Sequence, residues 1–116
     1  SLKFFHLRIS KDGLYHRARK PEKELAAFGG MTIGYVPVDK ERTKLLVVFS
    51  RCSERDRFNR KLALQICLGR FTKGKYIEVN RPQEKDLYEV LINAATAHEQ
   101  TIETQRKKLG IKKAAI

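Results

Sequence analysis

Three arginines and a serine crowd into seven residues near the middle of the chain. Arg51, Ser53, Arg55 and Arg57 fall in the run RCSERDR, which follows an apolar segment. We predict that this run enters a helix capped by Ser53, where free backbone N–H groups and the helix dipole attract an anion. Arginine forks suit phosphate oxygens, and Lys61 adds a cation on the same predicted helix. The pattern therefore predicts a phosphate site, with pairing of the arginines to neighbouring carboxylates as the alternative.

A second basic cluster further along the chain interleaves aromatic rings with cations. Its candidate ligand-binding residues are Arg70, Phe71, Tyr76, Asn80 and Arg81. An aromatic ring can stack on a base while a neighbouring cation neutralises a phosphate. Arg106, in the last turn of the second predicted helix, is a further candidate. The alternative is a solvated loop in which the Phe71 ring packs inward.

Patterns for metal binding and catalysis are sparse. Cys52 and Cys67 stand fifteen positions apart and no Cys-x-x-Cys or His-x-x-x-His spacing occurs, so we expect no metal site. No serine lies in a Gly-x-Ser-x-Gly pattern, and no glycine-rich phosphate loop is present. His6 and His16 could form the acid–base couple of a small ribonuclease, although two surface histidines are the simpler interpretation. We therefore expect no enzymatic activity and no cofactor.

Hydropathy patterning predicts the strands that must position these residues. Alternation over 3–9, 14–20 and 31–38 favours strands, and the apolar run 44–50 favours a central strand covered on both faces. The first two form a predicted hairpin whose wet, basic face carries Tyr15, Arg17 and Arg19. A short edge strand is predicted over 76–79.

Two helices complete the predicted fold, a first over 53–72 and a longer second over 83–109. On the first, Phe58, Leu62 and Ile66 share one face, and Cys67 is expected in the core. The prediction is one α+β domain over 1–116, with mostly strands in 1–52, and with the antiparallel sheet and the helices packed in two layers.

The apolar arc of the second helix is unusually wide. One stripe includes Leu87, Leu91 and Ala94, and a second includes Tyr88 and Ile92. A helix that is apolar on two faces of a small protein predicts a homo-oligomer assembled through that helix. The alternative is that the sheet and the first helix absorb both stripes.

The chain is strongly and unevenly basic. Its 116 residues hold 25 Lys and Arg against 13 Asp and Glu, a net charge of +12, and 19 of the basic residues lie in 1–82. Such a chain attracts polyanions. The two cysteines, together with the lack of an apolar run long enough for a membrane helix, favour a cytoplasmic protein with no membrane partner.

Residues 49–61 also resemble a pattern in small bacteriophage proteins. A cysteine, Cys52, follows a strand, and Asp-x-Phe-x-Arg-Lys over 56–61 opens a helix that Gly69-Arg70 closes. With the predicted sheet and two helices, this stretch is similar to the phage Thoeris anti-defence sponge family. It departs from that family's pattern at Ala63-Leu64, where Gly-Arg would be expected. The resemblance covers only residues 49–70, and no ligand-binding residue is carried over from it.

The resemblance implies a non-enzymatic, symmetric oligomer in the cytoplasm of a host bacterium. It would sequester a cyclic nucleotide immune signal, chiefly glycocyclic ADP-ribose and sometimes a cyclic oligonucleotide. Binding of a small phosphorylated nucleotide is thus the leading functional prediction. A DNA- or RNA-binding accessory protein that uses the basic hairpin and helix is the alternative, and the His6–His16 ribonuclease is the third.

Overall fold

A computed structural model describes residues 2–11, 13–17 and 24–108 of the chain, and side chains as far as residue 99. Its sheet has five strands in the order β2-β1-β3-β4-β5, and every neighbouring pair is antiparallel. The strands are β1 (Lys3–Ile9), β2 (Tyr15–Arg17), β3 (Met31–Pro37), β4 (Lys44–Arg51) and β5 (Ile77–Asn80). The helices are α1 (Arg60–Thr72) and the longer α2 (Leu87–Lys108). The predicted α+β class, a sheet followed by two helices, is confirmed.

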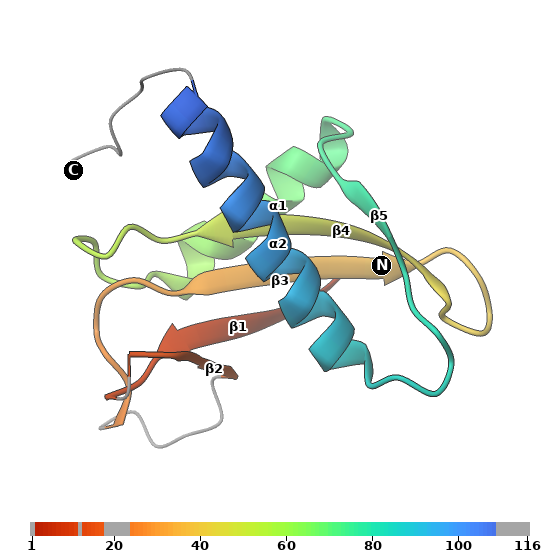
Figure 1. The fold of residues 1–116 in the computed structure, drawn as a ribbon, viewed down its shortest axis with the longest axis horizontal. Coiled ribbons are helices and arrows are strands. Elements are labelled where there is room, and N and C mark those ends of the chain that lie inside the picture. Colours follow the sequence, from red (N-terminus) through yellow and green to blue (C-terminus); the bar gives the residue numbers. More distant parts are fainter. Residues whose placement is uncertain (1, 12, 18–23, 109–116) are drawn as a thin grey trace.

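The two helices lie on opposite faces of the sheet, so the fold has three layers and the predicted two-layer packing is wrong (Figure 1). Side chains alternate along each strand, and Leu7, Ile33 and Val47 point to the side that we call the α2 face. Thr32 and Val48 point to the other side, the α1 face. The reason for the third layer lies in β4, because a strand that is apolar on both faces needs cover on both.

The α2 face holds the main core. Leu91 and Ala95 of α2 are buried with Leu7, Ile33 and Val47 of the sheet. The side chains of α2 that pack around this centre come from both predicted stripes. They are Leu87, Ile92 and Ala94, together with the ring of Tyr88 against Phe5. Both predicted stripes therefore contribute described residues to the core against the sheet, and the width of the arc no longer supports self-association, which stays a prediction.

The hairpin face predicted to be wet packs against α2. Tyr15 and Arg17 of β2 lie on the α2 face, and the Arg17 guanidinium carbon sits 3.5 Å from the centroid of the Tyr88 ring. A guanidinium over an aromatic face is a favourable contact. The prediction failed because alternation separates two faces but does not say which one a later helix will cover. Arg19 lies outside the described residues.

The first helix begins at Arg60, not at Ser53 as predicted. Its N-cap is Asn59, whose Oδ1 accepts a hydrogen bond from the Leu62 amide at 3.0 Å. The preceding loop instead pairs with the segment before β3, since the Phe58 amide donates to Ala27 and the Gly29 amide to Asp56. These long-range backbone bonds engage the Phe58 amide and the Asp56 carbonyl, which a helix over 53–59 would need for its own hydrogen bonds.

Small residues bring α1 close to the sheet. Ala63 and Cys67 are buried against it, and the Cys67 thiol lies 3.7 Å from the carbonyl oxygen of Thr32. A Cβ at Gly34 would lie 3.0 Å from a methyl group of Val48, so a larger residue would crowd this layer. Burial raises the pKa of the Cys67 thiol to about 11. The predicted stripe is reversed, because Leu62 is exposed.

The second helix begins at Leu87, four residues later than predicted. The Asp86 carboxylate caps it by accepting a hydrogen bond from the Glu89 amide at 3.0 Å, and a turn joins the Lys85 amide to Pro82. The helix is described as far as Lys108, so the predicted end at 109 lies outside the described residues. No helix in the described ranges is long and apolar enough to cross a membrane.

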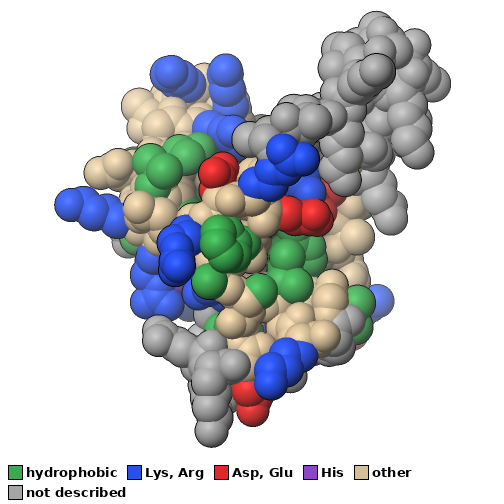
Figure 2. All heavy atoms as spheres, turned by 90° about the vertical axis from the view of Figure 1, so that its left-hand side faces the viewer, with side chains coloured by type: hydrophobic (Ala, Val, Ile, Leu, Met, Phe, Trp, Pro, Cys, Tyr) green, Lys and Arg blue, Asp and Glu red, His purple; other side chains and the backbone are tan. Residues whose placement is uncertain are grey.

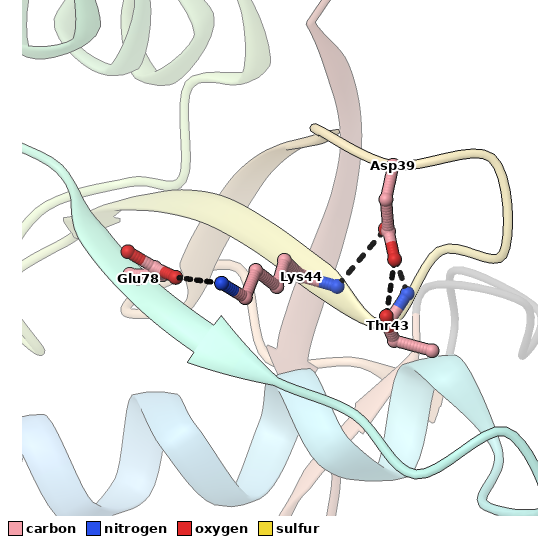
Figure 3. Close-up of polar contacts among 4 residues, drawn as sticks. All are labelled: Asp39, Thr43, Lys44 and Glu78. Carbon is pink, nitrogen blue, oxygen red and sulfur yellow. Dashed lines mark hydrogen bonds and ion pairs between the residues drawn. The ribbon is translucent and has the colours of Figure 1, made fainter.

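The turn between β3 and β4 is held by a carboxylate (Figure 3). Asp39 accepts hydrogen bonds from the Thr43 amide at 2.9 Å, from the Lys44 amide at 3.1 Å and from the Thr43 hydroxyl. These bonds, that of the Thr43 hydroxyl first, lower the pKa of the Asp39 carboxyl. Lys44 then reaches across to Glu78 of β5 at 3.8 Å. The polar cluster therefore organises the end of the sheet at which β4 begins.

Candidate functional site

A hollow opens on the α1 face where β1 meets the loop that leads into α1. Its volume is about 250 Å³, and it is lined by Arg8, Leu25, Ala27, Arg57 and Phe58. We call it the Arg8–Phe58 hollow. Figure 2 looks at the end of the molecule that carries this loop, where Lys and Arg side chains, with a few Asp and Glu side chains, stand around hydrophobic ones. The surface therefore combines positive charge with apolar area.

Arg8 is the most constrained cation of the hollow. Its guanidinium carbon lies 4.5 Å from the centroid of the Phe58 ring, and Nη2 donates to the Ala26 carbonyl at 2.8 Å. The Nε of Arg8 is buried and finds no hydrogen-bond partner within the described part of the chain. A buried donor on a charged group is costly to leave unsatisfied.

Arg57 repeats the arrangement at the rim. Its guanidinium carbon lies 5.4 Å from the Phe28 ring centroid, and the backbones of Phe28 and Arg57 form an antiparallel bridge. In the described ranges, neither Arg8 nor Arg57 forms an ion pair with a carboxylate. Two guanidinium groups on aromatic rings are therefore available for an anion.

Glycine permits the approach of the Phe58 ring. Gly30 has a φ of 112°, and a Cβ there would lie 2.7 Å from Cδ1 of Phe58. Gly29 before it has a φ of 75°, also in the region that L side chains rarely adopt. The glycine pair thus lets the 27–30 segment turn against the loop that carries Phe58.

The imidazole of His6, beneath the hollow, has a lowered pKa because it is buried near positive charge. Burial, and then the charges of Arg60 and Arg8, lower its pKa to about 4. Its Nδ1 lies 2.7 Å from the Thr32 hydroxyl, and its ring meets Phe58 edge-on with centroids 5.3 Å apart. At neutral pH the imidazole is therefore uncharged, as expected in a field of positive charge.

The first predicted phosphate cluster is dispersed. Arg51 points to the α2 face, where its Nε lies 3.0 Å from a carboxylate oxygen of Glu99. Ser53 does not cap a helix, because its hydroxyl accepts a hydrogen bond from the Arg55 amide within the loop. Arg55 is exposed on that loop and Lys61 is exposed on α1. Of this cluster, Arg57 alone lines the hollow.

The second predicted cluster lies elsewhere. Phe71 and Tyr76 contact each other at 5.2 Å between ring centroids, and the Arg70 guanidinium donates to the Phe49 carbonyl. Asn80 pairs with Lys44 at the opposite end of β4 from Arg51. The structure therefore does not bring the predicted ligand residues into one site. The side chain of Arg106 lies outside the described residues.

Arg81 binds backbone carbonyls of two turns and does not belong to an open site. Its guanidinium donates to the carbonyl of Arg42 at 2.9 Å and to that of Lys85 at 2.8 Å, with longer bonds to Glu41 and Gln83. All of its nitrogens are thus engaged by backbone oxygens. Arg81 ties the turn before β4 to the turn that precedes α2.

The two histidines of the ribonuclease alternative lie on the same face but do not stand opposite each other. His16 stands opposite Arg8 across β1 and β2, and His6 stands opposite Thr32 across β1 and β3. A neutral His6 that is hydrogen-bonded to Thr32 is a poor general acid. The described residues also contain no group of three His, Cys, Asp or Glu side chains able to hold a metal ion.

Sequence reasoning missed Arg8, Phe28 and Phe58 as members of one site. A signal existed in the alternation of β1, which sets His6 and Arg8 on the face opposite Leu7. Comparison with known proteins adds no member, since no family model, curated protein or solved structure matches the chain.

Proposed function

We propose that this chain binds a phosphorylated nucleotide in the Arg8–Phe58 hollow and holds it without chemical change. One observation carries the proposal, the guanidinium groups of Arg8 and Arg57, which line one hollow and form no ion pair within the described part of the chain. A phosphate oxygen in the hollow would accept charge-assisted hydrogen bonds from them. Arg57, on the same wall, would supply the second cation.

The aromatic rings supply the other half of the recognition. Phe28 is 44% exposed beside Arg57, so its ring can meet a nucleobase, while Phe58 forms part of the wall. Base–aromatic stacking tolerates different bases and adds about 1–3 kcal/mol per base. The hollow therefore suits a ligand with one anionic and one planar part.

The state of His6 beneath the hollow supports retention without turnover. The imidazole of His6 is uncharged at neutral pH, and its Nδ1 is engaged with Thr32. Arginine binds phosphate but does not transfer protons at this pH. The resemblance over residues 49–70 suggests a biological role for such binding, the sequestration of a cyclic nucleotide immune signal in the cytoplasm of a host bacterium.

Calorimetry with cyclic ADP-ribose as the probe tests the site. Arg8→Ala and Arg57→Ala should each weaken binding about ten- to a hundredfold, because each removes a charge-assisted contact of roughly 1.5–3 kcal/mol. Arg57→Lys should recover only part, because a point charge replaces a planar fork. Lys73→Ala is the matched control, since this exposed cation lies at the far end of α1.

Nucleic acid is the alternative ligand for the same charge. A polyanion contacts many cations, so binding of a short DNA duplex would weaken steeply with salt, and Lys73→Ala would cost about as much as Arg57→Ala. That result, with no heat from cyclic ADP-ribose, would replace the small-nucleotide proposal. Salt-insensitive binding that depends on Arg8 and Arg57 alone would support it.

A further inference from the structure

The first helix leaves three of its four large aliphatic side chains exposed. Leu62 is 51% exposed, Ile66 37% and Leu68 53%, whereas the small side chains of Ala63 and Cys67 are buried. A helix that covers a sheet normally buries its largest apolar residues. In α1 the opposite holds, so apolar area remains on the outside of this layer.

The outer surface of α1 also lacks charge along its middle. Residues 62–69 contain no Lys, Arg, Asp or Glu, and Gln65 and Gly69 are exposed among the aliphatic residues. Outward faces of surface helices usually carry charged side chains. We call this surface the α1 outer surface, and it consists of Leu62, Gln65, Ile66, Leu68 and Gly69.

Cations stand at both ends of this surface. From Phe58 to Ile77 the chain has no Asp or Glu, and its exposed cations apart from Arg70, which donates to the Phe49 carbonyl, are Arg60, Lys61, Lys73 and Lys75. Arg60 and Lys61 occupy the first helical turn, which holds no acidic residue. The helix dipole disfavours cations at that end, so these two do not stabilise α1. Their charge remains available to a partner.

We propose that the α1 outer surface docks an acidic amphipathic segment of a partner protein. Aliphatic residues of that segment would cover Leu62, Ile66 and Leu68, and its carboxylates would face the cations at the two ends of α1. A second copy of this chain would bring the same four cations to the contact, and their repulsion opposes a symmetric pairing. The surface is separate from the Arg8–Phe58 hollow and does not depend on its ligand.

Fluorescence anisotropy with a labelled synthetic helical peptide tests the proposal. The probe carries Leu and Ile at helical i, i+3, i+4 and i+7 spacing and Glu elsewhere. The double variant Leu62→Ser/Ile66→Ser should weaken its binding by about tenfold or more, as loss of central apolar contacts does. Because both side chains are exposed, the variant keeps its fold, which circular dichroism checks. Val38→Ser is the matched control, since Val38 is 56% exposed in another part of the surface.

A second peptide separates charge from apolarity. Replacing every Glu of the probe by Lys keeps its apolar face and should reduce the affinity about tenfold or more. Equal binding of both peptides, or no effect of Leu62→Ser/Ile66→Ser, would overturn the proposal. So would a dimer in light scattering that this double variant dissociates, because a second copy would then cover the surface.

Discussion

The two faces of the sheet are covered in different ways. On the α2 face, large side chains meet large side chains, and Leu91 of α2 is fully buried. Aromatic and charged groups add to this contact, with Phe49 stacked on His98 at 5.0 Å and Arg51 paired with Glu99. On the α1 face, the residues in contact are small, as at Ala63, Cys67 and Gly34. The comparison shows that α2 buries its large side chains against the sheet, whereas α1 leaves apolar and cationic side chains exposed.

The largest effect is expected at the centre of the α2 face. Leu91→Ala should lower the free energy of unfolding by about 2–5 kcal/mol, because a fully buried leucine leaves a cavity. Urea unfolding followed by circular dichroism measures the loss. A loss below about 1 kcal/mol would show that α2 is not packed as described and would break the comparison.

A smaller loss in the free energy of unfolding is expected at Gly30, which allows the Phe58 ring to approach. Gly30→Ala should cost about 1–3 kcal/mol, because φ is 112° and the new methyl group would collide with the Phe58 ring. Thermal unfolding gives the loss. Gly74→Ala is the control, since it also has a positive φ but open space around its Cβ. Equal losses at the two glycines would contradict the close approach of Phe58.

The pH dependence of stability tests the environment of His6 on the α1 face. His6 has a pKa of about 4 in the folded chain, against 6.5 as its ordinary value. The unfolded chain therefore binds a proton that the folded chain does not, and stability falls as the pH drops from about 6.5 towards 4. With allowance for solvent screening, we expect a loss of about 1 kcal/mol or less between pH 7 and 5.

His6→Gln is the matching variant for this measurement. It removes the titrating ring and should flatten the dependence over the same interval in urea unfolding at each pH. A variant that keeps the full slope would assign the dependence to other groups.

The smallest effect is expected on the α1 outer surface. Leu62→Ala should change the free energy of unfolding by no more than about 0.5 kcal/mol, because the side chain is 51% exposed. The measurement is the same urea titration as for Leu91→Ala, so the two leucines can be compared directly. A loss above about 2 kcal/mol would mean that α1 buries this side chain.

The strands could be predicted from the sequence because their signal is local. The strands predicted over 3–9, 31–38 and 44–50 are confirmed to within one residue at either end. The start of α1 could not be predicted in the same way. Phe58 pairs with Ala27, and a long-range backbone bond leaves no trace in the residues around position 53.

The candidate site was hidden from sequence reasoning for a related reason. Arg8 and Phe58 come from distant parts of the chain, and the fold alone brings them to one wall. Arg57 was found because charge and position mark it locally. Arg51 has the same local marks, yet alternation along β4 sends it to the α2 face and to Glu99. Composition predicts an excess of cations but not which cations the fold leaves unpaired.

The chain passes from one face of the sheet to the other through the four residues of the edge strand β5. Arg81 directly follows this strand, and its amide donates a hydrogen bond to the Thr43 carbonyl at 2.7 Å. Its guanidinium donates hydrogen bonds to the carbonyls of Arg42, in the turn before β4, and of Lys85, in the turn before α2. Because α2 continues from this point, separating β5 from β4 would also release the start of α2. We therefore expect the far edge of the sheet and the start of the second helix to open together in local unfolding, so that their amides exchange with solvent deuterium through a common opening.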